Sequence, residues 1–253
     1  MNISIINGIG NSMKYWANYI CAVKREKILN ESSIKFCISE YLVASENMEH
    51  NRNFTSNDQP IVKQVEFEKC YNIFKKRRAD LYLELSEDSQ NKAIFFEFKY
   101  LRDYNLTKME FNRFVDDFLR LASLLKNMRC ECYFMLVGNS ERIKNMLVAD
   151  NKSTRRNIDK IPEDKHNGIN ECLSLKYGNP QKVKLKELKC DNDKLHLERF
   201  VDEYTYNDNI KKLENNDELS ITLKYPQTNT IENISDIGVY IWQIELDTNH
   251  NFV

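Results

Sequence analysis

The most regular alternation of hydrophobic and polar positions lies in two neighbouring segments, residues 79–85 and 93–100. The first, ADLYLEL, carries leucine at every second position, and the second, AIFFEFKY, carries Ile94 and two phenylalanines in the same way. Side chains alternate between the faces of a strand, so each segment predicts a strand with one strongly apolar face. The polar stretch SEDSQN at 86–91 joins them, and together they predict a hairpin.

Helical spacing of apolar residues marks two other segments. Residues 31–45 place one group of residues on a single side of a helical wheel: Ile34, Cys37, Ile38, Tyr41, Leu42 and Ser45. Residues 108–127 carry a second stripe: Phe111, Phe114, Val115, Phe118, Leu121, Leu124 and Leu125. Residues 13–29 are mixed apolar and basic, and we expect a helix there as well.

The remaining segments complete the expected order of elements. We expect a loop at 47–60, strands at 61–67 and 130–137, a helix after Asn139–Ser140, a helix or strand at 195–204, and a strand pair added to the sheet edge at 219–225 and 237–246. Residues 151–190 give only a weak, basic signal. Helices alternating with strands predict an α/β layered core within a single domain over 1–253.

The hairpin also brings charged residues together. If the two strands fold back about a centre near residue 88, Asp80 lies opposite Glu97, and Glu97 and Lys99 project from one face. Two carboxylates and an ammonium group in strands this apolar are unfavourable unless they are paired or bind a ligand. Carboxylate oxygens suit Mg²⁺, the backbone carbonyl of Phe98 would add a ligand, and a nearby lysine can orient a water and stabilise charge on a phosphate.

The alternative is a plain salt bridge on an exposed hairpin face. Glu-x-Lys recurs in the chain, at Glu163–Lys165 and at Glu187–Lys189. Neither copy lies in a strongly apolar strand that follows an Asp-bearing strand. The strand context therefore favours residues 97–99 as the functional copy.

An Asp followed after about 16 residues by Glu-x-Lys in a hydrophobic strand resembles the PD-(D/E)xK nuclease superfamily, which has the restriction-endonuclease-like fold. Ala79 stands where that family usually has proline, a departure that removes no metal ligand. The resemblance implies an αβββαβ core at about 25–150, with a central mixed sheet flanked by helices. Residues 151–253 would then be an extension that completes or decorates the core.

The resemblance also implies roles for individual residues. Asp80 and Glu97 would bind Mg²⁺, for which Mn²⁺ can substitute, and Lys99 would position and activate the attacking water. A further acidic residue is expected on the first core helix, facing the metal. Glu31 lies about 60° from Ile34 on the wheel, beside the buried stripe, whereas Glu40 lies about 240° away on the expected solvent face. Glu31 is favoured as a ligand, directly or through water; alternatively it only begins the helix, where a negative charge suits the dipole.

Two arginines of the helix over 108–127 are candidates for nucleic-acid contacts. Arg113 and Arg120 are seven residues apart and so lie on one side of the helix. By resemblance, Arg120 would hold a phosphate. The alternative is an ion pair with Asp116 or Asp117.

A run of four basic residues precedes Asp80 and would lie near the mouth of the site. It consists of Lys75, Lys76, Arg77 and Arg78. Such a run can neutralise the phosphates of a nucleic acid. The alternative is an ordinary solvated surface.

Composition and charge narrow the protein class. The chain has 253 residues, of which 42% are hydrophobic and 30% charged, so a core is expected and global disorder is not. Its net charge is −1, but 151–190 hold ten basic against five acidic residues, which is compatible with a locally basic groove. Seven cysteines without a CxxC pair and four scattered histidines show no zinc-ligand spacing, and reduced thiols fit a cytoplasmic protein. No signal peptide or membrane span is expected.

The resemblance implies a metal-dependent nuclease that hydrolyses phosphodiester bonds, in DNA rather than RNA. It suggests a prokaryotic defence or restriction-type endonuclease, as a homodimer or within a larger defence complex. Two other hypotheses stay open. One is a catalytically inactive or partner-dependent nucleic-acid-binding or interaction module on the same fold, and the other is a structural protein whose charged hairpin face is plain surface.

Overall fold

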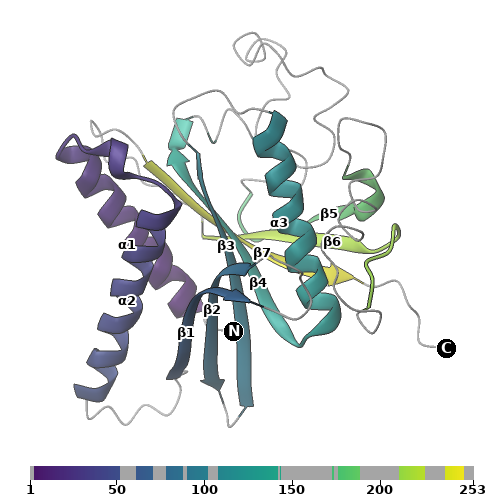
Figure 1. Ribbon diagram of the computed structural model, residues 1–253, viewed down its shortest axis with the longest axis horizontal. Coiled ribbons are helices and arrows are strands. Elements are labelled where there is room, and N and C mark those ends of the chain that lie inside the picture. Colours follow the sequence, from purple (N-terminus) through teal and green to yellow (C-terminus); the bar gives the residue numbers. More distant parts are fainter. Residues whose placement is uncertain are drawn as a thin grey trace.

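The structure of the protein is a computed structural model that describes residues 3–51, 61–70, 78–87, 90–101, 108–141, 143, 173, 176–188, 211–225 and 237–247. Their helices are α1 (Ile3–Ala22), α2 (Glu31–Asn51) and α3 (Lys108–Asn127), with short 3₁₀ helices η1 (Glu26–Ile28) and η4 (Leu185–Glu187). Their strands are β1 (Ile61–Cys70), β2 (Arg78–Glu87), β3 (Gln90–Leu101), β4 (Cys130–Asn139), β5 (Gln181–Lys184), β6 (Glu218–Tyr225) and β7 (Ile237–Asp247). The described chain is therefore α/β, as its hydrophobic pattern predicts (Figure 1).

The seven strands form one mixed sheet in the order β1-β2-β3-β4-β7-β6-β5. Strands β3 and β4 run parallel, whereas the other neighbouring pairs are antiparallel. A parallel neighbour cannot be reached through a tight turn, so the chain crosses between β3 and β4 through α3. The expected C-terminal strand pair is confirmed as β6 and β7, and it extends the same sheet beyond β4.

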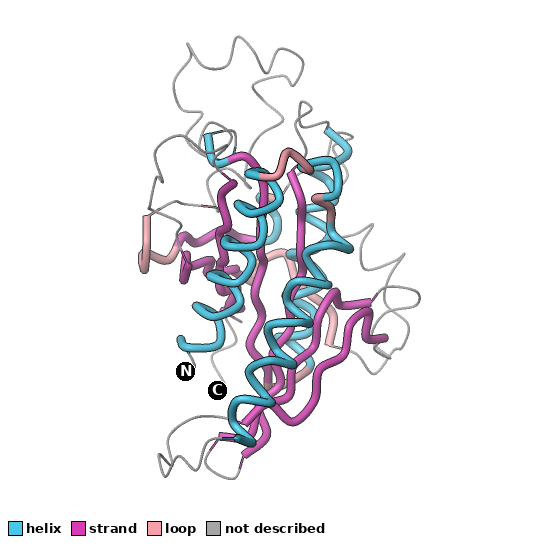
Figure 2. The backbone as a smooth tube through the Cα atoms, turned by 90° about the vertical axis from the view of Figure 1, so that its left-hand side faces the viewer, coloured by secondary structure: helices cyan, strands magenta, loops and turns pink. Residues whose placement is uncertain are grey.

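The helices cover opposite faces of the sheet (Figure 1). Helices α1 and α2 lie side by side over one face (Figure 2), and α3 lies over the other. The apolar face of the predicted hairpin packs toward α1 and α2, through Leu81, Leu83, Leu85, Ile94, Phe96 and Phe98. The core beneath α3 is built largely from aromatic residues, including Phe95, Phe118, Phe134 and Trp242. Full burial of each such side chain contributes about 1.5–3 kcal/mol, so both helical layers are held firmly against the sheet.

Helix α2 begins at a reciprocal cap that its sequence supplies. The amide of Ser33 donates to the Asn30 side-chain oxygen at 3.0 Å, and the amide of Asn30 donates to the Ser33 hydroxyl at 2.8 Å. The predicted stripe is confirmed for its described side chains, because Ile34, Cys37, Ile38 and Leu42 are buried and Tyr41 is half-buried, whereas the side chain of Ser45 lies outside the description. The cap therefore sets where the first turn of α2 begins.

The boundaries differ from the predictions in several places. The first helix begins at Ile3 and ends at Ala22, rather than covering 13–29, because Ile6, Ile9 and Met13 already face the sheet. Helix α2 continues to Asn51, into the expected loop, whose remainder lies outside the described residues. Strand β5 was not predicted. Its four residues, QKVK, contain a single apolar side chain, Val183, so the sequence offers no alternation to detect. The segment 195–204 and most of the helix expected after Asn139–Ser140 also lie outside the described residues.

Strands β3 and β4 approach closely at Gly138. Gly138 pairs with Leu101. A methyl group added at Gly138 would lie 2.8 Å from both the Cβ atom and the carbonyl oxygen of Leu101. Glycine is therefore required there for space. In the described part of the chain, none of the helices combines the length and the hydrophobicity needed to cross a membrane.

Candidate active site

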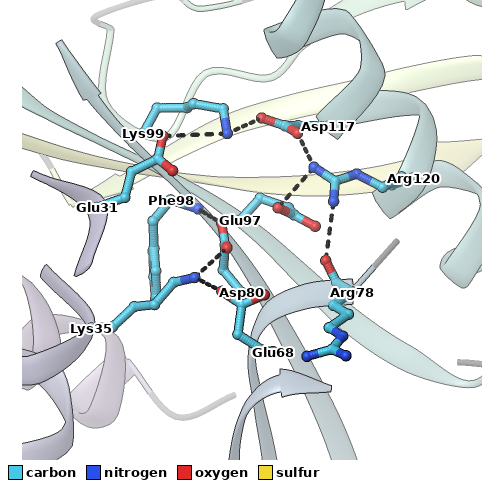
Figure 3. A network of polar contacts seen from close by, with 10 residues as sticks. All are labelled: Glu31, Lys35, Glu68, Arg78, Asp80, Glu97, Phe98, Lys99, Asp117 and Arg120. Carbon is cyan, nitrogen blue, oxygen red and sulfur yellow. Dashed lines mark hydrogen bonds and ion pairs between the residues drawn. The ribbon is translucent and has the colours of Figure 1, made fainter. Parts of the chain in front are cut away.

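The predicted hairpin register is confirmed. Leu81 pairs with Phe96 and Leu83 with Ile94, and the same register places Asp80 opposite Glu97. The backbone amide of Phe98 donates to Asp80 Oδ2 at 2.8 Å, so the carboxylate is tied to the neighbouring strand (Figure 3). Phe98 therefore takes part in the site through its amide, and a metal-binding role for its carbonyl stays a prediction.

Asp80 is held from the α2 side of the sheet. Lys35 Nζ of α2 lies 2.8 Å from Asp80 Oδ1 and also forms an ion pair with Glu68 of β1. Burial would raise the pKa of Asp80, but the bonds from Lys35 and from the Phe98 amide outweigh it, so the pKa of Asp80 is lowered overall. Asp80 is therefore an ionised carboxylate that already has a cation beside it.

Glu97 is held from the opposite side of the sheet. Its side chain is almost completely buried, and Arg120 of α3 donates from Nη2 to Oε2 at 3.1 Å. Burial raises the pKa of Glu97 well above its ordinary value, Asp117 and Asp80 raise it further, and the Arg120 guanidinium opposes the shift. Glu97 thus lies within electrostatic reach of two other carboxylates.

Lys99 lies between two carboxylates from different helices. Its Nζ is 2.9 Å from Asp117 Oδ2 of α3 and 3.6 Å from Glu31 Oε1 in the first turn of α2. Burial lowers the pKa of Lys99, but Asp117 and Glu31 more than offset this and raise it to about 12. Lys99 is therefore an ammonium ion at neutral pH, and Glu31, whose side chain is 47% exposed, lies beside it.

Arg120 forms an ion pair within α3, which the sequence analysis gave as the alternative to binding a phosphate. It pairs with Asp117, one turn earlier on α3, and Nη1 donates to the backbone carbonyl of Arg78 at 3.0 Å. Arg113 is exposed whereas Arg120 is buried, so the two arginines do not share an environment. The side chain of Arg78 is exposed, and Lys75, Lys76 and Arg77 lie outside the described residues.

Sequence reasoning did not assign three residues of this network to the site. Lys35 comes from α2, Glu68 from β1 and Asp117 from α3. A signal was available for two of them. Lys35 lies one turn after Glu31, on the same side of α2, and Asp117 lies one turn before Arg120. Glu68 had no comparable signal.

The donor chemistry of the site suits a hard divalent cation. Among the described residues, no three His, Cys, Asp or Glu side chains gather into a ready-made metal-binding cluster. Asp80 and Glu97 nevertheless offer adjacent carboxylates, the oxygen ligands that Mg²⁺ prefers. The network joins five carboxylates (Glu31, Glu68, Asp80, Glu97, Asp117) to three cations (Lys35, Lys99, Arg120). Burial disfavours the ionised form of Glu97, and a cation bound beside it would favour that form.

Comparison with known protein families, with curated proteins and with solved structures finds no significant match to this chain. The functional argument therefore depends on the geometry and charges of the site.

Proposed function

We propose that the protein is a divalent-metal-dependent nuclease that hydrolyses phosphodiester bonds, with DNA as the expected substrate. One observation carries the proposal. The β2–β3 register brings Asp80 beside Glu97, and Lys99 projects from the same strand face as Glu97. Lys99 pairs with Asp117, and Glu97 pairs with Arg120. Two carboxylates and an ammonium ion at one point of an apolar sheet suit metal-assisted phosphate chemistry.

The arrangement of elements supports the same proposal. Residues 31–139 run in the order α2, β1, β2, β3, α3, β4, which is the αβββαβ order that the PD-(D/E)xK resemblance implies. Strands β1 to β4 are adjacent in the sheet, and the crossover to the parallel strand through α3 follows β3, the strand that carries Glu97 and Lys99. The restriction-endonuclease-like identity of the core is part of the proposal, because fold alone does not establish function.

Each site residue has a role in this proposal. Asp80 and Glu97 would hold Mg²⁺, assisted by the Phe98 carbonyl and by Glu31. When bound, Mg²⁺ supplies Lewis-acid stabilisation of the phosphate and makes a water more acidic. Lys99, kept as an ammonium ion, orients the attacking water and stabilises negative charge that develops on the phosphate. The side chain of Arg78 is exposed and would neutralise a neighbouring phosphate of the nucleic acid.

Cleavage assays test the proposal directly. Plasmid, linear and single-stranded DNA and RNA would be incubated with wild-type protein in Mg²⁺, in Mn²⁺ and in EDTA, beside Lys99→Ala. A matched control is Lys92→Ala, because Lys92 lies on the same strand in an ion pair of 2.7 Å with Glu131, away from the site. We expect metal-dependent cutting that Lys99→Ala abolishes and Lys92→Ala retains. Equal loss in both variants, or cutting that persists in EDTA, would contradict the proposed site.

One observation favours the second candidate, a catalytically inactive nucleic-acid-binding module. Asp80 and Glu97 each already have a protein cation, Lys35 and Arg120 respectively. If these two cations already neutralise the carboxylates, the site needs no metal ion and would bind none. Calorimetric titration with Mn²⁺ separates the two candidates, because the module predicts no binding and unchanged retention of DNA in EDTA.

A further inference from the structure

Helix α3 links the two ends of the Glu-x-Lys segment. Glu97 contacts Arg120, Arg120 contacts Asp117, and Asp117 contacts Lys99 (Figure 3). Glu97 and Lys99 are two residues apart on β3, while Asp117 and Arg120 are one turn apart on α3. The four side chains therefore form one continuous path of ion pairs between a strand and the helix that follows it.

Arg120 acts at three points at once. Its guanidinium reaches Glu97, Asp117 and the backbone carbonyl of Arg78, which lies two residues before Asp80. A planar guanidinium holds such partners in a defined geometry that the single ammonium of lysine cannot reproduce. Arg120 thus ties the beginning of β2 to the middle of β3, and so relates Asp80 to Glu97.

Burial argues against a substrate-binding role for this pair. The side chains of Arg120 and Asp117 are 8% and 3% exposed. The amino groups of Arg120 already point at two carboxylates and a carbonyl. A phosphate of a nucleic acid would have to displace these buried partners, which is costly because buried carboxylates would lose their counter-ion. The exposed Arg113 has no such constraint.

We propose that Asp117 and Arg120 are positioning residues, which hold Lys99 and Glu97 in the geometry required for cleavage without contacting the nucleic acid. The inference rests on the proposed nuclease function. Asp117 orients the Lys99 ammonium toward the site, and Arg120 keeps the Glu97 carboxylate turned toward Asp80. Such supporting residues typically change metal affinity or activity by about 10–100-fold when they are replaced.

The test compares Asp117→Asn, Arg120→Lys and Arg120→Gln with the wild type. We would measure kcat and KM on DNA, Mn²⁺ affinity by calorimetry and the melting temperature Tm, each on the same preparation. The matched control is Asp217→Asn. Asp217 is as buried as Asp117, and it pairs with Lys126 of α3 at 2.7 Å.

Positioning predicts a specific split among these measurements. Asp117→Asn and Arg120→Lys should lower kcat by about 10–100-fold while KM changes by less than about threefold. Arg120→Gln should weaken Mn²⁺ binding by about tenfold. Asp217→Asn should lower Tm and leave kcat unchanged. Arg120→Lys retains the charge, so it decides the question if Asp117→Asn does not fold.

Four results would overturn the inference. A rise in KM with unchanged kcat would make Arg120 a substrate contact. Tighter Mn²⁺ binding by Arg120→Gln would make Arg120 a competitor of the metal. Wild-type kcat in folded Asp117→Asn and Arg120→Lys would leave the nuclease proposal standing and remove only the positioning role. A wild-type protein that neither cuts nor binds Mn²⁺ would overturn the nuclease function and the positioning role together.

Discussion

Lys35 of α2 lies 2.8 Å from the Asp80 carboxylate of β2 and at the same time pairs with Glu68 of β1. This lysine places a positive charge beside Asp80, which the proposed function makes a metal ligand. Its side chain is 18% exposed, against 8% for Arg120, and it carries a flexible four-carbon stem. Lys35 can therefore move aside more readily than Arg120 can.

Replacing Lys35 should tighten metal binding. In Lys35→Gln, Asp80 loses its internal counter-ion, and we expect Mn²⁺ affinity to rise roughly fivefold, equivalent to about 1 kcal/mol for a partly exposed ion pair. Calorimetric titration of both proteins measures this. Lys63→Gln is the control, because Lys63 is exposed on β1 and bonds Asn91. Weaker Mn²⁺ binding by Lys35→Gln would show that Lys35 supports the site instead of competing for it.

The two glutamates of α2 should differ in their effect on cleavage. Both side chains are exposed, but Glu31 lies 3.6 Å from Lys99, whereas Glu40 lies two and a half turns further along α2. We expect Glu31→Gln to lower the cleavage rate about tenfold, and Glu40→Gln to leave it unchanged. Rates measured at saturating Mg²⁺ on one DNA substrate make the comparison. Equal rates in the two variants would restrict Glu31 to beginning the helix.

Thiol labelling should distinguish Cys37 from Cys70. Burial raises the pKa of Cys37 to about 11, so its reactive thiolate falls about tenfold for each pH unit below that value. Cys70 is exposed. At pH 8, iodoacetamide should label Cys70 within minutes and Cys37 far more slowly, and the Cys37 rate should climb steadily toward pH 11. Peptide mapping by mass spectrometry follows each site, and fast labelling of Cys37 at pH 8 would mean that α2 opens from α1.

Gly138→Ala should destabilise the β3–β4 pair. The added methyl group would meet Leu101 at 2.8 Å, and one of the two contacts is a backbone oxygen that cannot turn away. We expect a loss of about 1–3 kcal/mol in the free energy of unfolding, measured by urea denaturation. Gly178→Asn is the control, because no atom lies within 4 Å of its added Cβ and asparagine tolerates the positive φ of 73°. Equal stability of Gly138→Ala and wild type would show that the strands can separate there at little cost.

The hydrophobic pattern of the sequence predicted the features that depend on neighbouring residues, namely the strand faces and the hairpin register. Strict alternation in β2 and β3 determines which residues face α1 and α2, and a one-residue slip would turn Leu83 and Phe96 toward the opposite face of the sheet. The facing of Asp80 and Glu97 follows from that register. The helical wheel of α2 likewise placed Glu31 beside the buried stripe, and its carboxylate lies 3.6 Å from Lys99.

The ion-pair partners of those residues could not be predicted from the local sequence pattern. Whether Arg120 pairs with Asp117 or meets a phosphate depends on how deeply α3 packs against the sheet, which the helix pattern does not reveal. Lys35 and Glu68 meet across α2 and β1, elements whose distance is set by the core between them. Tertiary packing therefore decided the ion pairs, while local alternation decided the strand faces.

Two of the three cations of the site come from helices on opposite faces of the sheet, Lys35 from α2 and Arg120 from α3. This has a consequence for synthesis on the ribosome. A nascent chain that has produced the hairpin, but not yet residues 108–127, contains Glu97 and Lys99 without either of their α3 partners. The ion-pair network is complete only when both helical layers have docked, so an incompletely synthesised chain lacks the organised site.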